Sequence, residues 1–299
     1  TMKKIALLVG ILLAFSLVFP LYRFCHRQTD GFTPRKIRKS FTNQNVPHCS
    51  STLSEEEKAL VEKILLEPLH YLGRGGQCYA FSTSDDKYVV KLLKHNNNYP
   101  KIWFRLIPFP FGYETKRKEK IAFKLCKLKK EYLSYEIALK NLIQETGILY
   151  MHLDAGTLPG VTIKLFDKIK VVHYLNADQL QFYIQKKGKP LYPGFQEMIR
   201  KGRIDLAHIA LDEIAQFLIK RCTKKIIDKD DGIWRNFAFY DGHPFQIDIG
   251  QFTYDSSMIT EEDFEINLMA FTRDFRNWLS SIDPSLEQHF KKALHFDAH

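Results

Sequence analysis

The longest apolar run of the chain lies at its start. Residues 5–22 contain no charged side chain and follow Lys3 and Lys4. A run of this length is just sufficient to cross the hydrocarbon core of a bilayer. A cleaved signal segment has the same basic start and apolar middle, but the end of this run lacks the small residues that cleavage needs. Residues 1–22 are therefore expected to form an uncleaved N-terminal transmembrane helix, with a cleaved signal segment as the alternative.

The residues after this run are polar and basic. Arg23, Arg27 and Arg35 begin a cationic cluster that outweighs the lysines before the run. Because positively charged flanks stay on the cytoplasmic side, the asymmetry favours a membrane-anchored, single-pass protein with a cytoplasmic body. Residues 23–52 are rich in Thr, Ser, Asn and Gln, and we expect them to form a polar tether.

The pattern of a folded domain begins near residue 53. Ser54 and Glu57 form a capping box, and apolar residues follow at helical spacing as far as Leu65. Pro68 stands where this helix should end. The sequence thus predicts a domain over residues 53–299.

A glycine-rich turn follows this first helix. Residues 72–81 predict two short strands joined by a turn, and residues 88–92 predict a third strand that carries Lys91. The turn contains three glycines: Gly73, Gly75 and Gly76. Glycine lets backbone N–H groups approach phosphate oxygens, and a nearby ammonium group neutralises them. A glycine-rich hairpin turn without a ligand is the alternative interpretation.

A second informative stretch covers residues 226–252. A long amphipathic helix, residues 204–221, precedes it, and Ile209 is one of the residues expected on the apolar face of that helix. Asp241 and Gly242 are typical of a tight hairpin turn between two short strands. Asp231 and Asn236 precede this hairpin and Asp248 follows it, so that their oxygens can converge on a hard cation such as Mg²⁺.

These residues resemble the catalytic motifs of the protein-kinase-like superfamily. In that family an Asp stands five residues before an Asn, and a strand hairpin and an Asp-x-Gly motif follow; Asp231, Asn236 and Asp248-Ile249-Gly250 match. The glycine-rich turn and Lys91 occur upstream in the family's order. Cys78 stands where a third glycine would be, and Lys229 stands where the family usually has a histidine.

The resemblance implies a fold and a set of roles. The fold would be α+β, a two-lobed kinase-like domain with a small lobe over about residues 53–170 and a large lobe over about residues 171–299. ATP and Mg²⁺ would be the cofactors. Gly73, Gly75 and Gly76 would cradle the phosphates, and Lys91 would hold them with a helical glutamate as its partner. That glutamate would be Glu136, with Glu131 as the alternative. Asp231 would serve as the catalytic base, and Asn236 and Asp248 would hold the metal.

The end of the chain indicates a subclass. Only 49 residues follow Gly250, and they contain no Ala-Pro-Glu motif. This is room for two or three helices and makes the large lobe short. The ending therefore looks more like that of atypical bacterial kinases, including the sugar kinases of the lipopolysaccharide inner core, than that of a signalling Ser/Thr kinase.

The charge is unevenly distributed. The chain has a net charge of +10, but residues 201–299 carry 12 basic and 17 acidic side chains, which leaves +15 on residues 1–200. An anionic partner is therefore expected for the first part of the chain. The five cysteines form no C-x-x-C pair, and this argues against a zinc site or a disulfide framework.

One basic stretch is dense enough to suggest its partner. Eight lysines and arginines and a single glutamate, Glu119, lie between residues 116 and 130, after an aromatic stretch at residues 99–113. Aromatic rings beside lysines are typical of a membrane interface. The alternative is that the rings pack on the domain and the lysines form a solvated helix face. No nucleic-acid motif is present, so nucleic acid is not an expected partner.

The sequence thus predicts an ATP- and Mg²⁺-dependent phosphotransferase at the membrane. Its acceptor would be a hydroxyl group, for which a membrane sugar, glycolipid or lipid is a candidate. An atypical Ser/Thr protein kinase is one alternative. A non-catalytic kinase-fold module that senses nucleotide or acts as a scaffold is the other.

Overall fold

The computed structural model describes residues 16, 18–38, 53–95, 113–153, 158, 160–230, 232–258 and 260–294. The described residues form an α+β fold, as expected from the sequence. They divide into two compact units, each of which has its own core. The first unit holds the described residues up to 38, from 53 to 95, and from 158 to 182, and the second holds residues 113–153 and those from 183 onward.

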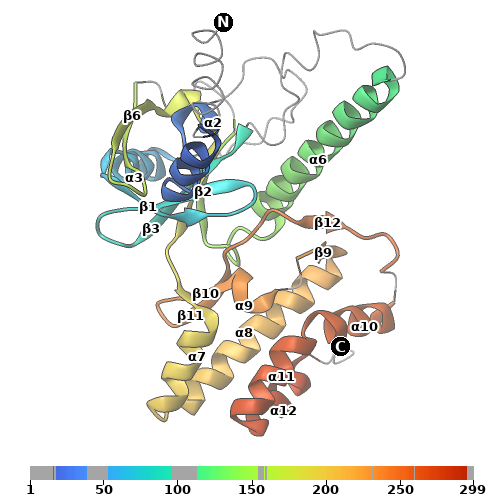
Figure 1. Cartoon of the computed structure of the whole chain (residues 1–299). Coiled ribbons are helices and arrows are strands. Elements are labelled where there is room, and N and C mark those ends of the chain that lie inside the picture. Colours follow the sequence, from blue (N-terminus) through green and yellow to red (C-terminus); the bar gives the residue numbers. More distant parts are fainter. Residues whose placement is uncertain are drawn as a thin grey trace, which may run out of the picture. The chain divides into compact units, whose positions relative to one another are not determined.

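The first unit is built on a curled sheet (Figure 1). The strands of the first unit follow the order β3-β2-β1-β5-β6, which is part of a seven-stranded sheet. The pair β1–β5 is parallel, whereas β1–β2, β2–β3 and β5–β6 are antiparallel. The strands run as β1 Leu69–Arg74, β2 Cys78–Ser82, β3 Tyr88–Leu93, β5 Thr162–Phe166 and β6 Val172–Asn176, and the short helix η1 Ala177–Gln179 follows β6.

Helix α3, Glu55–Leu66, begins at the predicted capping box. The Ser54 hydroxyl accepts the N–H of Glu57, and the Glu57 carboxylate accepts the N–H of Ser54. These two bonds satisfy backbone donors that the first turn of a helix leaves unpaired. Val61, Ile64 and Leu65 form the buried face of α3, which packs against β5.

Residues before 53 also belong to the packed core of the first unit. Helix α2, Pro34–Ile37, follows a turn in which Asp30 accepts hydrogen bonds from Tyr71 and Lys168. The ring of Phe32 is 3% exposed and lies 5.2 Å, centroid to centroid, from that of Tyr79. Residues 29–38 lie in the stretch expected to be a polar tether, but the fold here begins before residue 53.

Helix α8, Ile204–Thr223, is the centre of the second unit. Its bounds agree with the predicted helix over residues 204–221. Around it pack α7 Leu191–Arg200, β9 Ile226–Asp228, β11 His243–Gln246, α10 Glu261–Phe271 and α12 Pro284–Ala293. Ile209, expected on the apolar face, is 51% exposed, because the buried stripe follows Ala207, Ala210, Ile214 and Phe217 instead.

The predicted hairpin is present. Strand β10, Phe237–Tyr240, pairs antiparallel with β11, and with β8, Lys189–Pro190, on its other side. Asp241 and Gly242 both have positive φ angles, 50° and 86°, as a tight hairpin turn requires. Strand β12, Phe252–Tyr254, pairs with β9, and the short helix α9, Ile233–Asn236, lies directly before the hairpin. The remaining strands are β4 Ile148–His152 and β7 Phe182–Lys186.

The long helix α6, Tyr113–Asn141, also belongs to the second unit. It lies in the stretch that the sequence assigns to the small lobe, but its second half packs against β12. Two of its residues, Tyr132 and Tyr135, are almost completely buried there. The division into units therefore differs from a single boundary near residue 170.

Three helices follow β12 in the part of the chain that the structure describes. Thr272 separates α10 from α11, Arg273–Ile282. Thr272 is buried, its hydroxyl donates to the carbonyl of Leu268, and it accepts a hydrogen bond from Arg276. Helix α12 lies beside both α11 and α8.

The predicted transmembrane helix falls mostly outside the described residues. Residues 18–28 are helical in the structure. Within the described part of the chain, no helix combines the length and the apolar character needed to cross a bilayer.

The packing of Phe32 predicts a large effect of its removal. The variant Phe32→Ala leaves a cavity beside Tyr79 and Phe81 and should lower the free energy of unfolding by about 3–5 kcal/mol. The matched control Phe24→Ala removes a ring that is 59% exposed and should change it by less than about 0.5 kcal/mol. Urea denaturation measures both. Equal effects would show that residues 29–38 contribute nothing to the core.

Candidate active site

Two of the predicted site residues, Asn236 and Asp248, lie on the two chain segments that meet at the open end of the hairpin. Asn236 ends α9, is 2% exposed, and donates its side-chain amide to the carbonyl of Asp230 at 3.2 Å. The carbonyl of Asn236 accepts the N–H of Ile247 at 2.6 Å. Asp248 follows immediately, so Asn236 and Asp248 lie at the same end of the hairpin.

Asp248 is exposed, whereas the two residues after it, Ile249 and Gly250, are buried. One carboxylate oxygen accepts the N–H of Gly250 at 3.1 Å, and Ile249 is completely buried. The hydroxyl of Ser134 on α6 donates to the carbonyl of Ile249 and accepts the N–H of Phe252. These bonds hold the segment after Asp248 against α6 and leave the carboxylate available for a ligand.

Asp231, the predicted catalytic base, lies outside the described residues. Of the neighbouring acids, Asp230 is bonded to Arg235 at 3.1 Å and also accepts the N–H of Gly232. Asp230 is therefore occupied as a loop-forming residue. The role of Asp231 as the base stays a prediction from its spacing to Asn236.

A buried polar cluster stands behind this site. Arg221, near the end of α8, is 1% exposed, and its guanidinium lies 3.9 Å from the carboxylate of Asp228 on β9. Gln246, at the end of β11, donates to Asp228 at 2.6 Å and to the carbonyl of Asp248 at 2.8 Å. One cluster thus joins α8, the strand β9 and the backbone of Asp248.

Burial dominates the ionisation of this cluster. It raises the pKa of Asp228 to about 6, although the Arg221 charge acts in the opposite direction. Burial also lowers the pKa of Arg221. The guanidinium lies near the rings of three phenylalanines, of which Phe271 is nearest at 4.6 Å. A charge so desolvated depends on Asp228 for its compensation.

The sequence contained a signal for Arg221 that its charge obscured. Arg221 stands seven residues after Ile214 and four after Phe217, so it continues the buried stripe of α8. Ser134 and Gln246 had no comparable signal, because their roles depend on segments far apart in the chain.

The glycine-rich turn lies in the first unit, between β1 and β2. None of Gly73, Gly75 and Gly76 has a positive φ, and a Cβ added at Gly73 or Gly76 would meet nothing within 4 Å. The fold by itself therefore does not need glycine at these positions. A requirement for glycine there would have to come from a ligand.

Two lysines lie on or next to β3. Lys91 is partly exposed and stands opposite Ala80 on β2. Lys94, which the sequence analysis did not single out, follows β3, donates to the carbonyl of Gly75, and lies 4.3 Å from the ring centroid of Tyr79. Burial lowers the pKa of Lys94. Lys94 is thus a structural support of the glycine-rich turn.

The two glutamates proposed to serve Lys91 differ in environment. Glu136 forms an ion pair with Lys140 on its own helix at 2.6 Å. Glu131 is 5% exposed. A carboxylate with so little exposure requires a compensating charge or donor far more than an exposed one does.

The donor set at the end of the hairpin suits a hard cation bound partly through phosphate. Asp248 supplies a carboxylate and Asn236 an amide oxygen, and Mg²⁺ usually takes one or two such protein ligands together with phosphate and water. Among the described residues, no group of three or more His, Cys, Asp or Glu side chains is placed to hold a metal by itself.

A pocket of about 490 Å³ lies elsewhere in the second unit. Its walls include Glu145, Glu213, Phe217, Lys220 and His243. Glu145 pairs with Lys220, and Glu213 pairs with His243. None of the predicted site residues lines this pocket.

Comparisons with known proteins leave the family open. No family model and no curated protein matches the chain. A 2.2 Å structure of WbdD is 14% identical, with a TM-score of 0.32, and the match covers 73% of this chain and 43% of WbdD. A second structure, described as the bifunctional kinase-methyltransferase WbdD, is 15% identical, with a TM-score of 0.31 and coverages of 86% and 49%.

A third similar structure is the Rv3197–erythromycin complex from Mycobacterium tuberculosis. It is 14% identical, with a TM-score of 0.30 and coverages of 74% and 53%. The chain spans about half the length of the chain in each of these three structures. TM-scores of this size do not establish a shared fold, so a functional proposal depends on the residues of the chain itself.

The buried cluster predicts a pH-dependent effect of removing Arg221. The pKa of Asp228 is higher in the folded protein than the ordinary value for aspartate. Its ionisation therefore lowers the free energy of unfolding as the pH rises through about 6. Arg221→Met removes the positive charge beside Asp228, so the pKa of Asp228 rises further. The free energy of unfolding then continues to fall to higher pH. We expect destabilisation of about 3–5 kcal/mol at pH 8 and clearly less at pH 5.

Urea unfolding at the two pH values measures this difference. Lys201→Met, at a 57% exposed side chain, is the control and should be nearly neutral at both. Adding Asp228→Asn to Arg221→Met should remove the pH dependence. A loss of equal size at pH 5 and pH 8 would contradict the coupling of Arg221 to Asp228.

A substitution in the glycine-rich turn should change ligand binding without changing the stability of the fold. Gly76→Ala should leave the free energy of unfolding within about 0.5 kcal/mol, because the added Cβ has open space. The same variant should weaken ATP binding at least about tenfold if the turn cradles phosphate. Calorimetric titration with Mg-ATP and urea unfolding give the two readouts.

Gly188→Ala is the contrasting variant. Its Cβ would lie 2.5 Å from that of Ala238 and 2.6 Å from the ring of Phe245, so it should destabilise the fold by about 1–3 kcal/mol. Unchanged ATP affinity in Gly76→Ala would exclude a close approach of phosphate to this glycine.

Proposed function

We propose that the chain is an ATP- and Mg²⁺-dependent phosphotransferase of the atypical kinase type, which phosphorylates a hydroxyl group. The observation that carries this proposal is the placement of Asn236 and Asp248 at the same end of the hairpin. Asp248 is exposed there, in an Asp-Ile-Gly segment that α6 and Gln246 hold in place. The order of these residues is the order expected from the kinase-like motifs.

The proposed roles follow the chemistry of each side chain. Asp248 and Asn236 would bind Mg²⁺, which neutralises phosphate charge when it is bound. Lys91 would hold the phosphates of ATP. Asp231 would orient the acceptor hydroxyl and take its proton while the acceptor oxygen bonds to the γ-phosphorus. The bond from that phosphorus to the bridging oxygen breaks, and ADP leaves.

The buried cluster would act as a positioning device for this chemistry. Gln246 donates to both Asp228 and the backbone of Asp248, and Arg221 compensates the charge of Asp228. Phosphoryl transfer depends mostly on positioning and on charge stabilisation, so a rigid support behind the metal ligand is what this reaction needs.

The partner of Lys91 is proposed to be Glu131 or Glu136. Glu136 is engaged by Lys140, and this favours Glu131. Glu131→Gln and Glu136→Gln separate the two, because only the variant at the true partner should lower phosphoryl transfer in parallel with Lys91→Ala.

The acceptor is proposed to be a hydroxyl group on a membrane sugar or lipid. The charge of +15 on residues 1–200 supports a location at an anionic surface. A protein hydroxyl is the second acceptor to be screened.

Substitution of Asp248 tests the proposal directly. Asp248→Asn keeps the size of the side chain and removes its charge, so Mg-ATP turnover should fall at least about 10²-fold while ATP binding is weakened less. The matched control is Asp274→Asn, at a 79% exposed carboxylate on α11, and it should have the activity of the unmodified chain. Turnover is measured as ADP release by the full chain, with and without membrane glycolipids.

Three outcomes are informative. Turnover that depends on Asp248 and not on Asp274 supports the enzyme. Tight ATP binding without turnover, unaffected by Asp248→Asn, would identify a nucleotide-sensing or scaffolding module. No ATP binding at all would sink the proposed function.

A further inference from the structure

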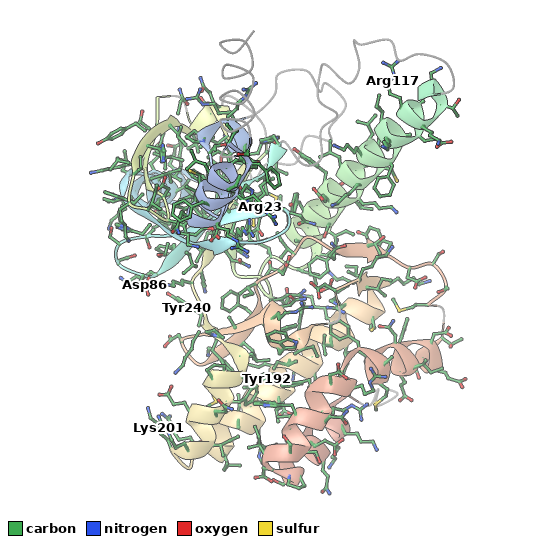
Figure 2. The ribbon with its side chains drawn as sticks, viewed as in Figure 1. Arg23, Asp86, Arg117, Tyr192, Lys201 and Tyr240 are labelled. Atoms are coloured by element: carbon green, nitrogen blue, oxygen red, sulfur yellow. The ribbon has the colours of Figure 1, made fainter. Side chains whose placement is uncertain are left out.

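Helix α6 consists of two halves with different surroundings. From Leu128 onward it has a buried face, which includes Tyr132 and Tyr135 and packs in the second unit. Between residues 115 and 127 no side chain is buried. Figure 1 shows the first half of α6 extending beyond β12 and β9, and Figure 2 places Arg117 near its outer end.

The first half of α6 and the helical turn that continues it carry a strong positive charge. Eight basic side chains and one acidic side chain lie between residues 116 and 130. Lys118, Lys120, Lys127, Lys129 and Lys130 are all exposed, and none of them forms an ion pair with a described residue. So many unneutralised cations on one helix require an anionic partner or remain solvated.

The charges are arranged around an exposed aromatic ring. Lys116, Lys120, Phe123, Lys127 and Lys130 follow one another at spacings of three and four, so they share one face of the helix. This set is called the basic face here. Phe123, at its centre, is 72% exposed, the largest exposure among the exposed large hydrophobic side chains of the described residues.

We infer that the basic face of α6 binds an anionic membrane surface. Lysines near such a surface are attracted to lipid phosphates, and a ring among them can enter the boundary between headgroups and acyl chains. A purely electrostatic partner would use the lysines but would leave the ring of Phe123 in water. The inference does not depend on the proposed phosphotransfer.

The opposite side of the same helix provides a matched control. Lys118 and Lys129 are exposed lysines of the same segment, but their positions fall outside the basic face. Exchanging two lysines there changes the net charge as much as exchanging two on the basic face. A difference in vesicle binding between the two double variants therefore shows that the position of the lysines on the helix matters, and not only the net charge.

The experiment uses the full chain and a local reporter. Phe123→Trp places a fluorophore at the centre of the basic face, and the spectrum of the unmodified chain is subtracted to remove the other tryptophans. The probes are vesicles of phosphatidylcholine alone and of phosphatidylcholine with phosphatidylglycerol. The N-terminal apolar residues are the same in every variant, so their contribution cancels.

With anionic vesicles the emission of the introduced indole should shift to the blue and should be quenched by brominated acyl chains. With neutral vesicles it should not. Lys120→Gln with Lys127→Gln should weaken the response about 25-fold, because each lysine near an anionic surface contributes about fivefold. Lys118→Gln with Lys129→Gln should weaken it clearly less, and added salt should weaken it in every case.

Several results would overturn the inference. One is no response to either vesicle. Another is an equal response to neutral and anionic vesicles, which would indicate delivery by the apolar N-terminal residues. Equal losses of the vesicle response in the two double lysine variants would show that the basic face is not the binding surface. Tight binding of a nucleic-acid duplex without any vesicle response would assign the charge to a different partner.

Discussion

The buried charge of Arg221 is the constraint around which the second unit is organised. A guanidinium group without access to water is costly unless an opposite charge and good packing compensate it. Asp228 supplies that charge from β9, and phenylalanine rings surround the cation. Because Gln246 bonds to the same carboxylate, α8, β9 and the end of the hairpin are held by one polar network. The position of Asp248 follows from this network.

This arrangement separates support from chemistry. The supporting residues are buried, whereas Asp248 is exposed and Asn236 is held by the loop that precedes it. Ser134 provides a second attachment, from α6 to the segment after Asp248. A site of this kind can bind phosphate and metal without reorganising its surroundings, which is the property that charge stabilisation needs. Helix α6 thus supports the candidate site with one half and offers a charged surface with the other.

Much of the local structure was predictable from the chain alone. The capping box at Ser54, the helix over residues 204–221 and the hairpin turn at Asp241 depend on neighbouring residues and appear where the pattern predicts them. The placement of Asn236 and Asp248 at the same end of the hairpin was predictable for a related reason. The two residues flank a hairpin, and the tight turn brings its two ends together.

Only the tertiary structure could decide the remaining features, because they join segments far apart in the chain. Phe32 is in the core through its contacts with β2, although the polar composition around it predicts a tether. Arg221 is buried because Asp228 compensates it, and its charge alone predicts exposure. The capping box, the bounds of α8 and the hairpin turn can be read from the sequence, because their causes are local. The tertiary structure decided which polar residues are buried supports and which remain available to a ligand, since burial is a property of the packed chain.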